Sequence, residues 1–379
     1  MALFNLITWN IQWGRGCDGV VNLRRIVDTA RGFADFDVLC MQEVARNFPG
    51  IPGAGGEDQF RRLAELLPGY AAVEGVGTDV RAANGAPASR EQGSRLRDAT
   101  GRESGAAPSS AGVASVSGVT SPKGARRRAE EGPLWGSDPA DAHRAGSDAP
   151  MAGSTVASPQ VGPLLRVTPA PVPPSDGARS QFGNMILTRL PVLQAFRHLL
   201  PWPAEPEVPS MQRVAVETVL QAPWGLVRVT TTHLEYYSAK QRAAQVERLR
   251  ELQAEAAAHA QDLDHSRKEG GPFQYAPRPG SAILTADFNF RPDDPLHARL
   301  QAPLGDGAPR YVDAWQIGHP GEPHAPTNGV FDREQWPEPY ACDFIFVTED
   351  LAGRVREVRV ISDTDASDHQ PLLLSLDGN

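Results

Sequence analysis

Polar residues of types that can bind a metal ion or move a proton stand at the ends of several short apolar stretches of this chain. They are Asn10, Glu43, His233, Asp287, Asn289, Asp343, Asp368 and His369. An apolar strand needs no carboxylate or imidazole at its end for packing, whereas catalytic groups are commonly held at loops and strand ends on a rigid scaffold. The pattern therefore indicates a site assembled from several strand ends.

Each of these residues has an ordinary structural explanation when it is considered alone. Glu43 would suit a solvated strand end, and Asp287 with Asn289 would suit an Asx-turn. His233 alone would suit a hydrogen-bonded structural histidine. Only their joint occurrence, each beside an apolar stretch, favours chemistry over packing.

The elements that must position these residues are short strands and a few amphipathic helices. Apolar runs and period-two alternation predict strands over residues 3–11, 37–41, 182–188, 213–220, 226–232, 281–286, 344–348, 355–361 and 372–376. The spacing of apolar residues predicts helices over residues 23–33, 59–67 and 238–259. Strands and helices share one core without the strict alternation of a doubly wound sheet, which indicates an α/β (α+β) fold.

A low-complexity segment interrupts this pattern. Residues 81–180 hold 19 Ala, 13 Gly, 12 Pro and 14 Ser, with Trp135 as their only aromatic residue. Such a composition cannot bury enough apolar surface to offset the entropy that is lost on ordering. We therefore predict one folded domain formed by residues 1–78 and 181–379, with a disordered insertion over residues 79–180.

Charge and cysteine content exclude several classes of protein. The 379 residues carry 37 Lys and Arg against 46 Asp and Glu, a net charge of −9. Because residues 81–180 contribute a charge of +3, the net charge of the other residues is near −12. No basic field therefore directs the protein to nucleic acid or to an anionic membrane. Three scattered cysteines exclude a disulfide framework. Without a recognisable signal peptide or a long apolar run, we expect a cytoplasmic protein with no stable membrane anchor.

Seven short blocks resemble the endonuclease/exonuclease/phosphatase family of DNase-I-like, metal-dependent phosphoesterases. They are TWN (8–10), QE (42–43), GNMILTRLP (183–191), THL (232–234), ADFN (286–289), CDFIF (342–346) and SDH (367–369). Ala286 stands where the family usually has glycine, a change that a strand end with negative φ tolerates. The resemblance implies a four-layered sandwich, with two mixed β-sheets packed face to face and helices outside. It also implies hydrolysis of a phosphodiester or phosphomonoester by metal-assisted attack of water.

The resemblance further implies a metal site. The metal-binding glutamate of the family corresponds to Glu43, and its terminal aspartate–histidine pair corresponds to Asp368 and His369. Mg²⁺ typically uses one or two protein carboxylates and keeps several waters. We therefore expect Mg²⁺, with Mn²⁺ as a substitute, on Glu43 and Asp368 with Asn10 assisting.

The remaining residues would act on water and phosphate. We expect Asp287 to orient or deprotonate the attacking water, and Asn289 to fix Asp287 or the phosphate. His369, held by Asp343, would contact a non-bridging phosphate oxygen. His233 would stabilise the developing negative charge or protonate the leaving oxygen.

Two weaker candidates and the substrate stay open. Asn184 would orient His233 or cap a backbone group, and Arg213 would reach a phosphate or form an ion pair. The partner is a phosphorylated substrate, with nucleic acid, nucleotide, lipid and sugar phosphate all compatible with the sequence. The oligomeric state is not indicated. The alternatives are a DNA or RNA endo- or exonuclease and a non-catalytic binding protein on the same scaffold. The latter predicts the loss of a metal- or water-binding residue, and the chain retains all of them.

Overall fold

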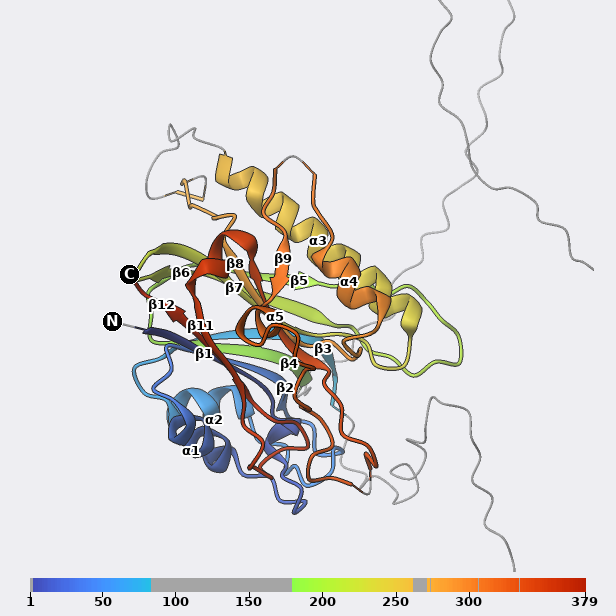
Figure 1. The fold of residues 1–379 in the computed structure, drawn as a ribbon. Helices are drawn as coiled ribbons and strands as arrows, with labels where there is room; N and C mark the ends of the chain where they lie inside the picture. The colour runs from blue at the N-terminus through green and yellow to red at the C-terminus, as the bar shows by residue number, and fades with distance from the viewer. Residues whose placement is uncertain (1–2, 83–178, 262–270, 273, 306, 334) are drawn as a thin grey trace, which may run out of the picture. The chain divides into compact units, whose positions relative to one another are not determined.

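The first of two β-sheets draws its strands from both ends of the chain, in the order β11-β12-β1-β2-β4-β3 (Figure 1). These strands are β1 (Leu3–Asn10), β2 (Val38–Arg46), β3 (Ala71–Arg81), β4 (Arg179–Thr188), β11 (Val355–Val360) and β12 (Leu372–Asp377). Only β1 and β2 run parallel, and the other neighbouring strands are antiparallel. Because a parallel pair needs a crossover connection, β1 and β2 are joined through a 3₁₀-helix (Gln12–Gly14) and α1 (Leu23–Phe33).

The second sheet has the order β5-β6-β7-β8-β10-β9. Its strands are β5 (Val192–Leu199), β6 (Val214–Ala222), β7 (Gly225–His233), β8 (Ala282–Asp287), β9 (Tyr311–Asp313) and β10 (Asp343–Thr348). Here too only one pair, β7 and β8, is parallel, and α3 (Ala239–Gln261) lies in its crossover. Ser238 begins this helix, because its hydroxyl accepts a hydrogen bond from the Gln241 main-chain N–H at 3.0 Å.

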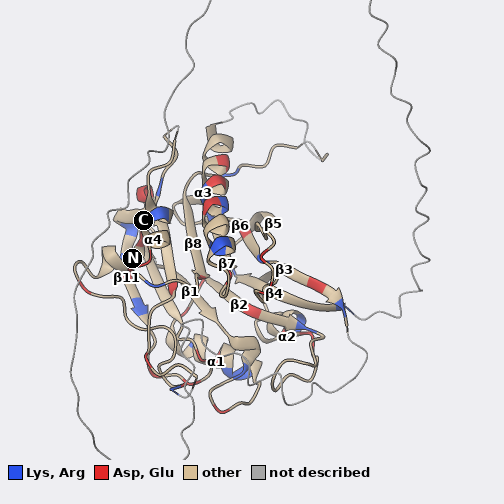
Figure 2. Cartoon of the chain, turned by 90° about the vertical axis from the view of Figure 1, so that its right-hand side faces the viewer, with Lys and Arg blue, Asp and Glu red and all other residues tan. Residues whose placement is uncertain are grey.

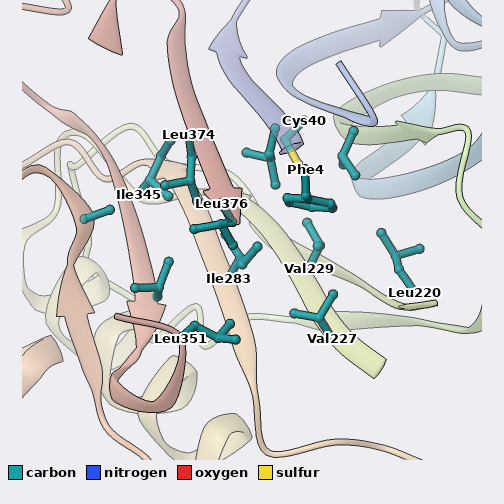
Figure 3. Close-up of a cluster of buried hydrophobic side chains, with 14 of the residues drawn as sticks. Phe4, Cys40, Leu220, Val227, Val229, Ile283, Ile345, Leu351, Leu374 and Leu376 are labelled. Carbon is teal, nitrogen blue, oxygen red and sulfur yellow. The ribbon is translucent and has the colours of Figure 1, made fainter. Parts of the chain in front are cut away.

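The two sheets pack face to face over an apolar core. Figure 3 shows side chains of this core, with Phe4, Cys40, Leu374 and Leu376 from the first sheet and Val227, Val229, Ile283 and Ile345 from the second. On the outer face of the first sheet lie α1 and α2 (Gln59–Leu66), and on that of the second lie α3 and α4 (Pro295–Gln301). The predicted four-layered α/β sandwich is therefore confirmed.

The structure, a computed structural model, describes residues 3–82, 179–261, 271–272, 274–305, 307–333 and 335–379. All of them belong to one compact unit. Among these described residues, none of the helices is both long enough and apolar enough to cross a membrane.

All predicted strands and helices are present, but the sequence did not reveal β3, β5, β9, α4 and α5 (Ala314–Gly318). The strand β3 contains Gly75 and Gly77, and glycine weakens a strand pattern. The elements β9 and α5 span three and five residues, too few to show a period.

The edges of the predicted insertion need correction. The strand β3 continues to Arg81 and β4 begins at Arg179, and these two residues are paired in register. Residues 79–81 and 179–180 are therefore strand residues, held partly by the Arg179 guanidinium, which donates to Asp79 Oδ1 at 2.6 Å. The rest of the predicted insertion, residues 83–178, lies outside the described residues.

Glycines allow β3, β4 and β6 to approach one another closely. A Cβ atom on Gly183 would lie 1.9 Å from the main-chain oxygen of Gly75, and one on Gly75 would lie 2.7 Å from Cβ of Val216. No side chain fits at either distance, so these positions help to set how closely the strands pack.

We expect Gly183→Ala to lower the free energy of unfolding by about 3 kcal/mol or more, because the added methyl group meets main-chain atoms that cannot move aside. Urea unfolding followed by circular dichroism measures this. The matched control is Gly353→Ala, whose Cβ would meet nothing within 4 Å. We expect the control to change stability by less than about 1 kcal/mol. Equal stability of the two variants would contradict the close approach.

Candidate active site

The ends of three neighbouring strands in the second sheet bring polar residues together. His233 and Asp287 end β7 and β8 and are direct partners in the parallel register. Asp343 begins β10, and because β10 runs antiparallel to β8, it pairs with Asp287. The three side chains are all buried. The register of the sheet therefore fixes their order along its edge.

In the first sheet, a bulge aims Glu43 at the same place. Asn10 ends β1, and the pairing of β2 with β4 shifts register between Met41 and Val44. Glu43 lies in this bulge with a φ of 62°, a left-handed conformation that costs a non-glycine residue about 1–3 kcal/mol. Bulges commonly re-aim a side chain beside a functional site. Here the Glu43 carboxylate faces Asn10.

A buried polar contact next to the site joins the two sheets. The Gln42 amide nitrogen donates to Thr8 Oγ1 in the first sheet at 3.1 Å and to Thr231 Oγ1 in the second at 2.7 Å. The Thr285 hydroxyl donates to the same Thr231 Oγ1 at 2.9 Å. These contacts hold the strand ends of both sheets in one alignment.

Two amide side chains organise three carboxylates. The Asn10 amide nitrogen donates to Glu43 Oε1 at 3.0 Å and to Asp287 Oδ2 at 2.9 Å. The Gln12 amide nitrogen donates to Asp368 Oδ2 at 2.8 Å, while the Gln12 main-chain N–H donates to Asn10 Oδ1 at 3.1 Å. Asn10 thus orients two carboxylates through its nitrogen, while its oxygen accepts one hydrogen bond and keeps a second lone pair.

The local electrostatics fit a divalent cation. Burial, followed by the negative charge of Asp368, raises the pKa of the Glu43 carboxyl to about 7. Burial also raises the pKa of Asp368. Gln12 Oε1 is buried and has no hydrogen-bond partner among the described residues. Buried oxygens that carry an excess of negative charge are the ligands that hard divalent ions take.

His369 is held through both ring nitrogens. Its Nδ1 lies 2.8 Å from Asp343 Oδ2, and its Nε2 lies 3.7 Å from Asp287 Oδ2. The hydroxyl of Thr327 also donates to Asp343 Oδ2, at 2.7 Å. Burial of the ring would lower its pKa, but the carboxylates of Asp343 and Asp287 outweigh burial and raise the pKa of His369 well above its usual value.

His233 is in the opposite state. The Asn289 amide nitrogen donates to the main-chain oxygen of Leu234 at 2.9 Å, which fixes the orientation of that amide. The same nitrogen lies 2.9 Å from His233 Nε2, so this ring atom accepts and Nδ1 carries the proton. Burial, together with the positive charge of Arg213, lowers the pKa of His233 to about 3. The ring is therefore neutral, and Nδ1 lies 3.8 Å from Glu43 Oε1.

The two weaker candidates take structural contacts. The Asn184 amide donates to the main-chain oxygen of Val214 at 2.8 Å, and Asn289, not Asn184, contacts the His233 ring. Arg213 forms a buried ion pair with Glu235, with 3.3 Å between Nε and Oε2. Of the two expectations for each residue, the structure shows the backbone cap for Asn184 and an ion pair, buried rather than exposed, for Arg213.

The sequence did not indicate three residues of the site. Gln12 follows Asn10 by two positions. In a strand, such spacing would put the two side chains on one face, but β1 ends at Asn10. Thr327 and Asn328 lie in the stretch PTNG, which resembles an ordinary turn. No local signal distinguishes them, because their partners Asp343 and His369 are 16 and 41 residues away in the chain.

The model of the endonuclease/exonuclease/phosphatase family matches residues 7–369 of the chain. No curated protein sequence matches it. Among solved structures, an endonuclease/exonuclease/phosphatase from Beutenbergia cavernae DSM 12333 is 21% identical with a TM-score of 0.50, and the match covers 99% of this chain and 72% of that one. An endonuclease/exonuclease/phosphatase from Bacteroides vulgatus is 14% identical with a TM-score of 0.54. That match covers 100% of this chain and 99% of the other. The mannosyl-6-phosphatase Bt3783 of Bacteroides thetaiotaomicron VPI-5482 is 14% identical with a TM-score of 0.51, covering 99% of both chains.

At these identities the solved structures show a shared fold, and the family model adds the sequence evidence. That model extends from within β1 to the pair Asp368 and His369 just before β12, and so spans both sheets and every strand end described above. The chain therefore belongs to the endonuclease/exonuclease/phosphatase family.

Proposed function

We propose that this protein is a Mg²⁺-dependent phosphoesterase that hydrolyses a phosphodiester or phosphomonoester bond by attack of water. The observation that supports this most is the convergence of Glu43, Asp287 and Asp368 on the amides of Asn10 and Gln12. Members of the family typically hydrolyse phosphoester bonds and are generally dependent on a divalent metal. We take residues 1–78 and 181–379, with the short strand extensions that flank them, as the catalytic domain.

Glu43 and Asp368 would hold the ion, because Asp368 is buried, Glu43 is mostly buried, and the negative charge of Asp368 raises the pKa of the Glu43 carboxyl. Asn10 and Gln12 would orient these two carboxylates through the hydrogen bonds described above. When bound, Mg²⁺ supplies the positive charge that offsets the anionic phosphate. An oxygen-only ligand set of this kind suits Mg²⁺ or Mn²⁺ better than zinc.

Asp287 would accept a proton from the attacking water. Its Oδ1 accepts from the Asn289 main-chain N–H at 3.0 Å, and its Oδ2 accepts from the Asn10 amide. A carboxylate that is held by a donor on each oxygen keeps one orientation, and such a fixed geometry is what general-base catalysis requires. The Asx-turn that Asp287 forms with Asn289 thus serves the chemistry as well as the loop.

The two histidines would supply hydrogen-bond donors of different kinds. His369, whose protonated form Asp343 and Asp287 favour, would contact a non-bridging phosphate oxygen. His233 is neutral and turns its Nδ1–H toward Glu43, while its Nε2 lies 3.4 Å from Asp287 Oδ2. We therefore assign His233 to stabilising the developing negative charge, because a neutral ring with so low a pKa has no extra proton to give to a leaving oxygen.

The substrate class has two candidates. One structural neighbour is named as a mannosyl-6-phosphatase, which acts on a phosphomonoester. A nuclease is favoured by an aromatic cluster in which the Trp336 ring lies 6.1 Å from Tyr236 and 6.0 Å from Tyr340. Arg291 lies over the Tyr340 ring at 4.6 Å, and rings with a nearby cation can stack on bases.

Surface charge gives a nuclease less support. Lys and Arg alternate with Asp and Glu along α3 (Figure 2). Arg248 on this helix is paired with both Glu251 and Glu255. Cations that are neutralised in this way contribute little to the attraction of a nucleic acid backbone. We therefore place nucleic acid second to a small phosphorylated substrate.

A panel of substrates with Mg²⁺ tests the proposal. It should span single- and double-stranded DNA, RNA, an aryl phosphodiester, inositol phosphates, sugar phosphates and sphingomyelin. We expect metal-dependent hydrolysis of at least one member and no activity after EDTA treatment. Folded protein that hydrolyses none of them with either Mg²⁺ or Mn²⁺ would leave the non-catalytic binding protein as the better reading.

We expect Asp287→Asn to lower kcat by about 10²–10⁴-fold, because the amide cannot accept a proton from water. The rate is measured on the substrate that the panel identifies, with folding checked by circular dichroism. Asp350→Asn, an exposed carboxylate that contacts Ser281, serves as the control and should keep the wild-type rate. A near-normal kcat in folded Asp287→Asn protein would remove Asp287 from the role of base.

We expect Glu43→Gln to raise the Mg²⁺ concentration at half-maximal activity by about tenfold or more, because a carboxylate ligand is replaced by a neutral amide. A Mg²⁺ titration of the rate measures this. Glu357→Gln on β11, an exposed residue paired with Arg359, is the matched control. An unchanged titration in the Glu43 variant would exclude Glu43 from the ligand set.

A further inference from the structure

Asn328 is fixed by main-chain contacts to two segments of the site. Its N–H donates to the Tyr340 oxygen at 3.0 Å, and its own oxygen accepts from the Tyr340 N–H at 3.2 Å. It also forms an isolated bridge with His369. The residue thus lies between the segment that leads into Asp343 and the segment that carries Asp368 and His369.

The side chain of Asn328 reaches the catalytic candidate His369. Its amide group lies 2.9 Å from His369 Nε2, the ring nitrogen that faces Asp287. The amide oxygen accepts from a protonated Nε2, and the amide nitrogen donates to an unprotonated one. The opposite ring nitrogen, Nδ1, contacts Asp343. The imidazole turns about its Cβ–Cγ bond, and contacts at both ring nitrogens resist that turn more strongly than a contact at one.

The remaining contacts argue against two other roles for Asn328. Only 1% of the residue is exposed, so it is too deeply buried to bind a substrate itself. The end of the Asn328 amide that does not face His369 has no hydrogen-bond partner among the described residues, and the main-chain contacts already hold the loop.

We propose that Asn328 is a positioning residue that fixes the His369 ring through Nε2, so that the ring keeps one plane beside Asp287 before substrate binds. The consequence for the rate rests on the proposed function. The fixing of the ring does not, because it follows from the contacts at the two ring nitrogens. Asn328 contacts neither substrate nor metal and acts only through His369.

Two variants separate positioning from packing. Asn328→Ala removes the amide, and Asn328→Leu removes it while keeping most of its volume, so that a cavity cannot explain a shared effect. Asn5→Ala is the matched control. Asn5 makes two side-chain hydrogen bonds, to the Asp35 oxygen and to Ser375, at the opposite end of β1 from the site. Circular dichroism establishes that each variant is folded.

The kinetic readout is the division between kcat and KM on the substrate that the panel identifies. We expect both Asn328 variants to lower kcat by about 10–100-fold, the usual effect of losing a residue that orients a catalytic group. KM and the Mg²⁺ titration should change by less than about threefold, because the binding groups remain. Asn5→Ala should behave as wild type.

The second readout does not depend on turnover. It is the ¹H NMR resonance of the His369 ring N–H that faces Asp343, assigned by its loss in His369→Gln. We expect this resonance to broaden or disappear in both Asn328 variants and to persist in Asn5→Ala, because a ring that is no longer fixed exposes its proton to exchange.

The two readouts give distinct outcomes. A broadened resonance together with a lower kcat supports the proposal. If the wild type hydrolyses no substrate, the proposed function fails, and a broadened resonance alone still supports the positioning of the ring. A sharp, unshifted resonance in both folded variants overturns the proposal, whatever the rate. A kcat within about twofold of wild type in both variants overturns the claim that this contact serves the chemistry.

Discussion

A single amide group, that of Asn10, joins the two sheets at the point where the candidate chemistry takes place. It donates to Glu43 from the first sheet and to Asp287 from the second. A hydrogen bond tolerates a change of only a few tenths of an ångström before it weakens. The two sheets must therefore keep one spacing and one alignment, and much of the fold maintains that alignment. The apolar core sets the spacing, Gln42 ties the facing strands, and glycines permit close approach at the far strands.

The two histidines at these aligned strand ends differ in protonation state because their neighbours differ. Both rings are buried, and burial alone would make both neutral. His369 faces Asp343 and Asp287, while His233 has Arg213 nearby and accepts a hydrogen bond from Asn289. One residue type at two places a few ångströms from the same carboxylate thus acquires two protonation states. Environment, rather than residue type, divides the roles between them.

The sequence revealed most of the fold because the apolar strands are short, well separated and each followed by polar residues. The site residues at strand ends could be predicted for the same reason, as Asp287 directly after a buried strand illustrates. The conformation of Glu43 could not, since it depends on a bulge that arises from the pairing of β2 with β4. Gln12 and Asn328 were missed because their roles depend on Asp368 and His369, residues that only the folded chain brings near.

The strand orders of the two sheets have a consequence for the arrangement of the site. Read in the order given for each, both sheets place their one parallel pair third and fourth, with antiparallel strands on either side and a helix in the crossover. The two sheets thus repeat one strand pattern, with β1 and β2 equivalent to β7 and β8. Asn10 pairs with Gln42 as His233 pairs with Asp287, so Asn10 and His233 occupy equivalent positions, as do Gln42 and Asp287. The same two strand ends therefore carry two neutral amides in the first sheet and an imidazole and a carboxylate in the second. One backbone pattern, used twice, serves alignment on one side and chemistry on the other.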